Sequence, residues 1–261
     1  MVLTTILRRA GAYKLYERYL RSQLAKGPIP QHVGIILDGN RRWAQLRQSR
    51  YKDGHVAGAD TAEKVLDWCV DLGIRTLTLY VLSAENLQRS PEEVSELLNL
   101  IDQRLTRLSQ DQRLERHKVR VKGLGKTELL PGKIKALLSS IEEKTADHDQ
   151  HFLNIAMAYG GRLEIVDVVR SIAARVKSGE LDIADVDQGI IEKNLYTAHL
   201  PNPEPDLIIR TSGEERLSGF LLWQSAYSEL VFLDAYWPDF RKIDVMRAIR
   251  TYQHRVRKFG R

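Results

Sequence analysis

From residue 32 onward, short apolar runs of strand length alternate with longer stretches whose apolar residues recur at helical spacing. The predicted strands are Val33 to Leu37, Thr76 to Leu82, Lys118 to Lys122, Phe152 to Ala158 and Asp206 to Arg210. The predicted helices are Val56 to Leu72, Pro91 to Leu108, Pro131 to Ala146, Leu163 to Lys177 and Ile243 to Arg255. Strands that alternate with helices favour parallel pairing. The sequence therefore predicts an α/β domain with a central, largely parallel sheet flanked by helices.

The length of 261 residues suits one large domain with a sizeable core. The sequence contains no run of eighteen apolar residues, and its N-terminus lacks the apolar stretch of a signal peptide. We therefore expect a cytoplasmic protein. Cys69 is the only cysteine, which excludes an intrachain disulfide and a cysteine-rich zinc site.

The N-terminal residues carry an amphipathic pattern with basic side chains between its apolar positions. The apolar positions are Leu3, Ile6, Leu7, Ala10, Tyr13, Leu20 and Leu24. Such a helix would lie on an anionic membrane surface or pack on its own domain, and the pattern fits both arrangements equally. A segment rich in proline and glycine, Gly27 to Pro30, then separates residues 1–31 from a body of residues 32–261.

The formal net charge of +6 is unevenly distributed along the chain. Residues 1–31 carry a net charge of +5 and residues 241–261 a net charge of +7, which leaves −6 for the body between them. A protein that binds duplex nucleic acid usually has a basic face on its folded body. The charge distribution therefore argues against nucleic-acid binding.

The run from His32 to Trp43 places a carboxylate, a glycine, an amide and two arginines directly after an apolar strand. Ligands of open α/β sheets bind beyond the carboxyl ends of the strands, and Asp38 stands where the first strand must end. Gly39 permits a tight turn, and a helix from Asn40 to Gln48 would then offer free backbone N–H groups to a diphosphate. Mg²⁺ would be needed between that diphosphate and Asp38. The alternative is a simple turn in which Asp38 only caps the helix.

The second predicted strand also ends in polar residues. Ser83 and Asn86 offer short hydrogen-bonding arms, and Arg89 precedes a helix that is marked by an N-cap serine and a first-turn proline. An arginine at that place would clamp a phosphate. The alternative is an ordinary polar loop between a strand and a helix.

The last predicted strand ends in Arg210, and Arg216 and Ser218 follow shortly after it. Two guanidinium groups and a hydroxyl suit a diphosphate, because arginine donates bidentately and stays charged. The alternatives are that Arg210 is a solvated strand terminus and that Arg216 pairs with Glu214 or Glu215.

Two other segments resemble binding motifs less closely. Tyr159 to Arg162 has the glycines of a phosphate-binding turn, but close packing between a strand and a helix is the favoured interpretation. Asp147 to His151 has residue types that ligate metals, but it lies between a helix and a strand, and a solvated loop is favoured.

Taken together, these segments resemble the cis-prenyltransferases, the undecaprenyl diphosphate synthase family, from His32 to Arg261. The matching stretches are His32 to Trp43, Gly54-His55, Leu79 to Arg89, Asn154 to Arg162, Asp206 to Ser218, Phe220 to Glu229 and Trp237 to Phe240. The resemblance implies a catalytic domain over residues 32–261, a hydrophobic tunnel, a homodimer and Mg²⁺-dependent condensation of isopentenyl diphosphate with an allylic diphosphate. The new double bond would be cis, and peripheral contact with the inner face of the cell membrane would be compatible with the basic N-terminal helix.

The resemblance also implies roles for individual residues. Asp38 would be the central catalytic carboxylate and a Mg²⁺ ligand, and Glu229 the second metal carboxylate. The allylic diphosphate would be bound by Gly39, Asn40, Arg41, Arg42, Trp43 and His55. Isopentenyl diphosphate would be held by Arg210, Arg216, Leu217 and Ser218. Asn86, as a catalytic residue, would lie near the reacting carbons with Ser83, Ala84, Glu85 and Arg89.

Some positions depart from the common family pattern. Tyr51 stands where many members have an arginine, and Lys258-Phe-Gly260 lacks the arginine of the usual ending. Val81, Leu87 and Gly219 differ from residues frequent in long-chain members. The short-chain, farnesyl-forming actinobacterial branch is resembled most by the stretches Leu82 to Arg89, Asn194 to Thr197 and Arg216 to Phe220. They predict (2Z,6E)-farnesyl diphosphate, made from geranyl diphosphate, as the product. The alternatives are a long-chain polyprenyl diphosphate synthase and a noncatalytic partner subunit of a prenyltransferase complex.

Overall fold

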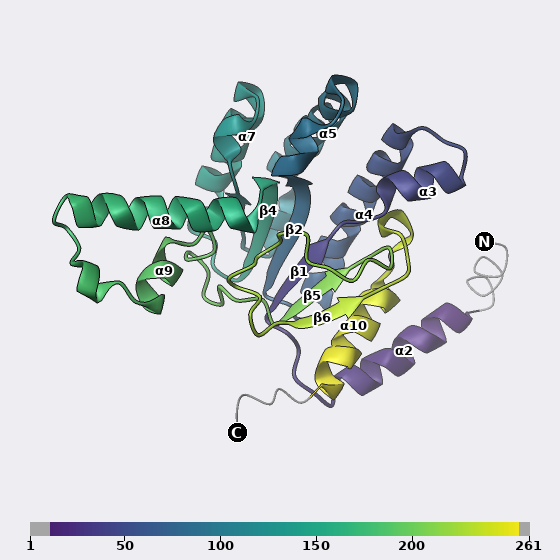
Figure 1. Cartoon of the computed structure of the whole chain (residues 1–261). Helices are drawn as coiled ribbons and strands as arrows, with labels where there is room; N and C mark the ends of the chain where they lie inside the picture. Colours follow the sequence, from purple (N-terminus) through teal and green to yellow (C-terminus); the bar gives the residue numbers. More distant parts are fainter. Residues whose placement is uncertain (1–10, 256–261) are drawn as a thin grey trace.

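The computed structural model describes residues 11–255, and within them six strands form one sheet (Figure 1). The strands are β1 (His32–Ile36), β2 (Thr76–Ser83), β3 (Val119–Leu124), β4 (His151–Tyr159), β5 (Leu207–Arg210) and β6 (Glu229–Phe232). Their order is β3-β4-β2-β1-β5-β6, and every neighbouring pair is parallel. The prediction of an α/β fold with a parallel sheet flanked by helices is confirmed.

The described helices agree with the expected ones, with shifted ends. They are α2 (Ala12–Leu24), α3 (Asn40–Leu46), α4 (Tyr51–Asp71), α5 (Pro91–Ser109), α6 (Gln112–Arg116), α7 (Gly132–Lys144), α8 (Gly161–Lys177), α9 (Gln188–Asn194) and α10 (Lys242–His254). Sequence analysis missed β6, α6 and α9, because elements of four to seven residues are too short to display a clear period. Between residues 11 and 255, no helix is long and apolar enough to cross a membrane.

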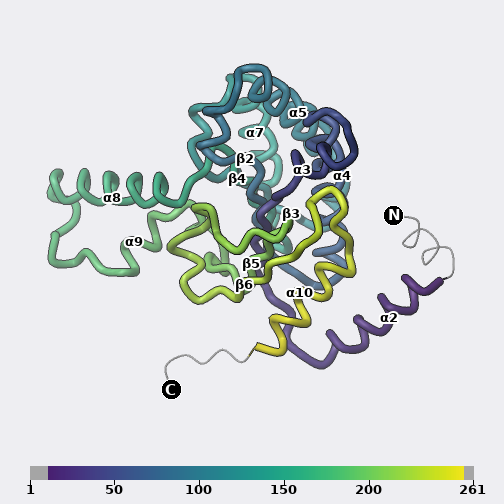
Figure 2. The backbone as a smooth tube through the Cα atoms, turned by 45° about the vertical axis from the view of Figure 1, so that its right-hand side comes forward, coloured from purple at the N-terminus to yellow at the C-terminus, as the bar shows by residue number. Residues whose placement is uncertain are grey.

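The two faces of the sheet have different coverings. Val33 and Ile35 of β1 point to the larger apolar cluster, which includes side chains of α4, α5, α7 and α10. Ile36 belongs to a smaller cluster on the other face, together with Phe220. A Cβ at Gly34 would come within 2.9 Å of the Phe220 ring, so a glycine there lets that ring lie directly on the sheet. Figures 1 and 2 show α8 extending away from the sheet, with α9 close to it.

Parallel pairing brings the reactive strand ends to one edge of the sheet. Ile36 is paired with both Tyr80 and Arg210, so the chain leaves β1 beside the ends of β2 and β5. Asp38 follows two residues after β1, and Ser83 is the last residue of β2. The predicted convergence of three polar strand ends is therefore confirmed.

The described part of the N-terminal helix packs on its own domain. Leu20 and Leu24 of α2 are buried in the main core. The Gln253 side chain of α10 donates to the backbone oxygen of Leu24 at 3.0 Å, and Lys242 pairs with Glu17 at 2.9 Å. Both views show α2 beside α10 (Figures 1 and 2). The apolar positions that the sequence pattern placed before residue 11 lie outside the described residues, as does the Lys258-Phe-Gly260 ending.

We expect Leu20→Ala to lower the free energy of unfolding by about 2–5 kcal/mol, because the leucine side chain is fully buried. Leu15→Ala is the control in the same helix, since Leu15 is 65% exposed, and it should cost less than about 0.5 kcal/mol. Chemical denaturation of the intact chain measures both changes. Equal losses would contradict the described packing of α2.

Candidate active site

A cavity of about 950 Å³ opens at the carboxyl edge of the sheet. It lies between the ends of β1, β2 and β5 and the first turns of α3 and α8. Most of the predicted binding and catalytic residues line it: Asp38, Gly39, Asn40, Arg41, Arg42, His55, Ser83, Glu85, Asn86, Arg89, Arg210, Arg216 and Ser218. The structure therefore brings together residues that are up to 180 positions apart in the sequence.

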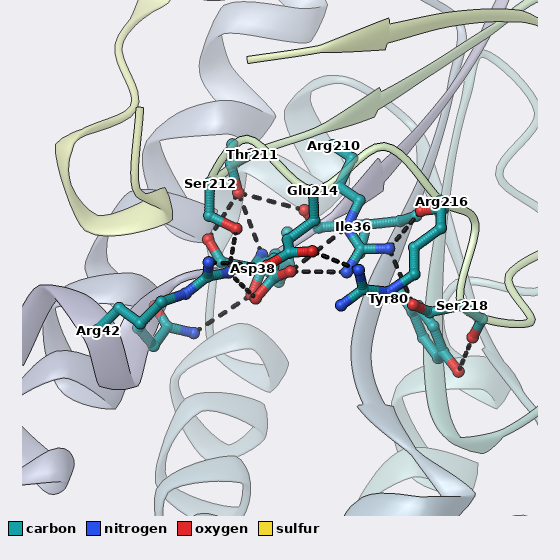
Figure 3. A network of polar contacts seen from close by, with 12 residues as sticks. Ile36, Asp38, Arg42, Tyr80, Arg210, Thr211, Ser212, Glu214, Arg216 and Ser218 are labelled. Carbon is teal, nitrogen blue, oxygen red and sulfur yellow. Dashed lines mark hydrogen bonds and ion pairs between the residues drawn. The ribbon is translucent and has the colours of Figure 1, made fainter. Parts of the chain in front are cut away.

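The centre of the site is an ion pair between Asp38 and Arg210 (Figure 3). Nη2 and Nε of Arg210 donate to Oδ2 of Asp38 at 2.7 and 3.3 Å. Nη1 of Arg210 donates to Oγ of Ser218 at 2.8 Å and to the backbone oxygen of Arg216. Arg210 is only 4% exposed, so it is not the solvated strand terminus considered from the sequence.

These contacts determine the charge of Asp38. Burial by itself raises the pKa of this carboxyl, but hydrogen bonding and charge from Arg210, with smaller effects of Arg42 and Ser212, hold the pKa below its usual value. Asp38 is therefore ionised at neutral pH. An ionised carboxylate at the cavity is the group that a divalent cation requires.

Arg42 bridges two carboxylates at the same edge. Its Nη1 donates to Glu214 at 2.9 Å, and its Nη2 donates to Ser212 at 2.6 Å and to Asp38 at 3.4 Å. Glu214 also pairs with Arg216, as one sequence alternative expected, yet both residues line the cavity. The role of Glu214 as a bridge between two arginines was not foreseen, because the sequence does not show which arginines meet it (Figure 3).

The turn after β1 is fixed by backbone geometry. The φ angle of Gly39 is +101°, and a Cβ there would lie 2.6 Å from the Tyr236 ring, so the predicted glycine turn is confirmed. Thr211 Oγ1 accepts from the N–H of Asp38 at 3.1 Å and donates to its backbone oxygen at 2.7 Å. These contacts set the direction in which the Asp38 side chain leaves the sheet.

The segment after β2 is held by reciprocal hydrogen bonds. The N–H of Ser83 donates to Oδ1 of Asn86 at 3.1 Å, and the N–H of Asn86 donates to Oγ of Ser83 at 3.2 Å. The two side chains therefore cap a short 3₁₀ turn, Ala84–Gln88, while they also line the cavity. Arg41 lies with its guanidinium carbon 4.7 Å from the centre of the Tyr51 ring, so the tyrosine at this family position supports a neighbouring arginine.

A second, mainly apolar cavity of about 190 Å³ adjoins the first. Leu37, Asn40, His55, Val81 and Leu97 line both cavities. The deeper part lies between the sheet and helices α4 and α5, with a wall that includes Leu66, Leu79, Leu100, Ile101, Leu105, Leu108, Ile155 and Met157. An apolar cavity that continues from a charged one matches the expected tunnel.

Several predicted residues do not line either cavity. Among the described residues, the walls of both cavities lack Trp43, Ala84, Leu87 and Leu217. Trp43 packs under the guanidinium of Arg47 at 4.0 Å, and Leu87 packs against the main core. Of the three positions expected to control chain length, Val81 lies where the cavities meet and Gly219 lines the charged one.

Glu229 lies away from Asp38 within this chain. It is the first residue of β6 and lies beside Leu207 of β5 in register. Because Leu207 comes three residues before Arg210, Glu229 lies about 10 Å from the carboxyl edge of the sheet along the strand direction. Its carboxylate pairs with Arg255 at 3.0 Å. The two carboxylates of one chain therefore cannot ligate one Mg²⁺, and the expected Asp38–Glu229 pair is wrong for a single chain. The role of Glu229 was implied by the family resemblance alone, and β6, which fixes its place, was not predicted.

Two interpretations of glycine and histidine segments need correction. Gly160, Gly161 and Arg162 line the charged cavity, in addition to the packing role that was favoured. A Cβ at Gly161 would lie 2.7 Å from the Gly219 oxygen, which accepts the Gly161 N–H at 2.7 Å. His148 is buried rather than solvated, but within residues 11–255 no group of three or more potential ligands is arranged to hold a metal ion.

We expect Asp38→Asn to lower the free energy of unfolding by about 1–3 kcal/mol, because buried Arg210 loses its only carboxylate partner among the described residues. The pKa of Asp38 is lowered in the folded protein, so its ionised carboxylate stabilises the fold fully above the ordinary aspartate pKa. This stabilisation is lost as the pH falls through the lowered pKa of the folded protein. Denaturation of wild type and variant at pH 7 and at pH 3 measures this. Glu85→Gln, in the same cavity, is the control, and an equal loss in it would contradict the assigned pair.

A family model described as "Putative undecaprenyl diphosphate synthase" matches residues 36–260. The chain is 51% identical over 249 residues to a tritrans,polycis-undecaprenyl-diphosphate synthase (geranylgeranyl-diphosphate specific) of Methanopyrus kandleri, covering 95% of this chain and 91% of the relative. It is 48% identical over 255 residues to the protein of that name in Methanocaldococcus jannaschii, with 98% and 91% covered.

The fold is also similar to a solved structure of lavandulyl diphosphate synthase from Lavandula x intermedia in complex with dimethylallyl diphosphate. The TM-score is 0.87 at 34% sequence identity, and the match covers 89% of this chain and 99% of that protein.

Proposed function

This chain belongs to the undecaprenyl diphosphate synthase family of cis-prenyltransferases, and we propose that it condenses isopentenyl diphosphate with an allylic diphosphate to form a cis double bond. The observation that carries this proposal is the junction of a cationic cavity with an apolar one at His55 and Val81. A prenyl diphosphate has one charged end and one hydrocarbon end, so it matches both parts. The clustering of Asp38, Arg210 and Arg216 supports a catalytic chain rather than a noncatalytic partner subunit.

The reaction breaks the bond between the allylic carbon and its diphosphate and joins that carbon to isopentenyl diphosphate, which then loses a proton. Arg41, Arg42 and Arg89 face the cavity where they would stabilise negative charge on the leaving diphosphate. The apolar cavity would exclude water from the reacting allylic carbon, which prevents hydrolysis. Asn86, fixed by Ser83, lies on the wall from which it would guide the departing proton.

The residues present fit a bound Mg²⁺. This ion typically takes one or two carboxylates together with substrate phosphates, and Asp38 supplies an ionised carboxylate beside the phosphate-binding arginines. When bound, Mg²⁺ would neutralise charge on the departing diphosphate. Asp38 would hold the ion, and Arg210 would then turn its donors to the incoming diphosphate.

The exposed side of α8 supports a homodimer. Leu163, Val166 and Val169 are 39%, 43% and 58% exposed and recur every three residues. An apolar stripe of this kind on a helix that extends from the sheet suits a second copy of the chain. Sedimentation equilibrium measures the mass of the particle in solution and so tests for the homodimer. A monomer at micromolar concentration would contradict the proposed dimer. Cytoplasmic location and peripheral contact with the membrane remain part of the proposal.

We propose a product longer than farnesyl diphosphate, made from a primer longer than geranyl diphosphate. Both relatives named above are described as geranylgeranyl-diphosphate specific and as undecaprenyl-diphosphate synthases. The expected (2Z,6E)-farnesyl product is the second candidate, favoured by Val81 at the junction of the cavities. Leu87 no longer supports it, because that side chain packs into the core.

The choice between the two products is tested in separate reactions with labelled isopentenyl diphosphate and Mg²⁺. Each reaction contains one primer: geranyl, farnesyl or geranylgeranyl diphosphate. We expect the longest primer to react best and the dephosphorylated products to be long-chain polyprenols. A fifteen-carbon product from geranyl diphosphate would favour the second candidate. In that case Val81→Ala should lengthen the product, because two fewer methyl groups at the junction admit a larger hydrocarbon, an effect of about 1–3 kcal/mol.

We expect Arg210→Ala to weaken the binding of isopentenyl diphosphate by about 2–4 kcal/mol. The variant removes a buried guanidinium that would contact a desolvated phosphate. Arg216→Ala should have a smaller effect, since its side chain is 62% exposed. Steady-state kinetics with each substrate varied measures both. A larger increase of KM for the allylic primer than for isopentenyl diphosphate would reverse the assignment of the two diphosphate sites.

A further inference from the structure

A small cavity of about 40 Å³ adjoins the apolar cavity. The two cavities share four wall residues, which are Leu66, Asp111, Arg113 and Leu153. Among the described residues, none that lines the charged cavity also lines the small one. The small cavity therefore lies at the end of the apolar cavity that is remote from the diphosphate-binding arginines.

The order of the three cavities follows strand β2. Leu77, Leu79 and Val81 are alternate residues of this strand, so their side chains lie on the same face of the sheet. Leu77 lines the small cavity, Leu79 lines the apolar cavity, and Val81 lies where the apolar and charged cavities meet. A hydrocarbon that grows away from the charged cavity would therefore pass Val81 first and Leu77 last.

The wall between the apolar and small cavities carries a guanidinium group. Arg113 of α6 donates to Oδ2 of Asp111 through Nε at 2.9 Å and through Nη2 at 2.6 Å. Its Nη1 donates to Oδ1 of Asp67 in α4 at 2.7 Å and to the backbone oxygen of Glu63 at 3.3 Å. These bonds tie α6 to α4 at the place where one cavity ends and the other begins.

This guanidinium faces a largely apolar space. The wall of the small cavity includes Cys69, Val70, Ile74, Leu77, Leu114 and Val119. A hydrocarbon that presses against a charged group removes its water without supplying a hydrogen bond, so a prenyl chain is disfavoured there. The side chain of Arg113 is 33% exposed, so it has room to turn outward into solvent when its bonds to the two aspartates break.

The apolar cavity alone is too small for a long polyprenyl chain. Pockets that enclose a drug-sized ligand measure about 300–1,000 Å³, whereas this cavity measures about 190 Å³. A longer chain must displace part of the wall, and the small cavity shows where apolar space continues. Arg113 stands between these two spaces.

We propose that Arg113 is a gate that limits the length of the hydrocarbon product. This inference rests on the proposed function. While Arg113 is bound to Asp67 and Asp111, the growing chain ends in the apolar cavity. When the guanidinium turns outward, the apolar and small cavities join, and the chain extends past Leu77. Arg113 therefore determines product specificity at a place remote from both diphosphates.

The first test compares the products of Arg113→Ala and wild type in separate reactions with the same primer. We expect the most abundant product of Arg113→Ala to be longer by at least about one isoprene unit. Arg113→Met keeps much of the side-chain volume but lacks the hydrogen bonds, and it should lengthen the product less. If Arg113→Ala does not fold, Arg113→Met replaces it in this and the following test.

Arg21→Ala is the matched control. Arg21 also pairs with a carboxylate of α4, Asp71, but among the described residues the walls of the three cavities do not include it. The control should give the wild-type product distribution. Equal product lengths in wild type and Arg113→Ala, or an equal increase in Arg21→Ala, would overturn the inference.

Binding of straight-chain alkyl diphosphates of increasing length tests the gate without turnover. In calorimetry with wild type, each further buried CH₂ group should tighten binding about fourfold until the hydrocarbon reaches Arg113, and the affinity should then level off. In Arg113→Ala the affinity should keep rising for at least about two more carbons. If the wild type condenses no substrates, the proposed function fails by itself and this series still decides on Arg113. The same plateau length in both proteins, or a wild-type affinity that does not depend on length, contradicts the gate.

Discussion

Parallel pairing of β1 with β2 and β5 determines which side chains can meet in this molecule. Because Ile36 lies beside Arg210 in register, the chain that leaves β1 brings Asp38 to the guanidinium that ends β5. The ends of β2 and β4 reach the same edge and supply Ser83 and the turn at Gly160. The apolar cavity lies against the adjoining face of the sheet, so the charged and hydrocarbon-binding regions share a wall.

Several arginines of the charged cavity already pair with carboxylates. Asp38 contacts Arg210, and Glu214 bridges Arg42 and Arg216. Such pairs fix long side chains before a diphosphate arrives, which reduces the entropy lost on binding. A diphosphate that binds these arginines must also replace the carboxylates as their partners. This favours binding of the diphosphate together with a divalent cation, because the cation would then bind the carboxylate oxygens.

The sequence predicted the sheet and most of the cavity because both depend on local signals. Apolar runs located the strands, and polar residues directly after them located Asp38, Asn86 and Arg210. Other features depend on register or distant contacts, which periodicity does not show. The role of Glu229 was implied by the family resemblance, and only the register of β6 shows where its side chain lies within one chain. The bridge through Glu214 depends on an arginine about 170 residues earlier in the chain.

The packing of α2 on α10 has a consequence for synthesis of the chain. The first described helix has its main packing partner in residues 242–254, and central β1 completes its pairing only with residues 207–210. A chain emerging from the ribosome must therefore carry an unfinished sheet and the exposed apolar side of α2 until nearly all of it has been made. Contacts this distant in sequence slow folding and prolong the time in which chaperones can engage the nascent protein.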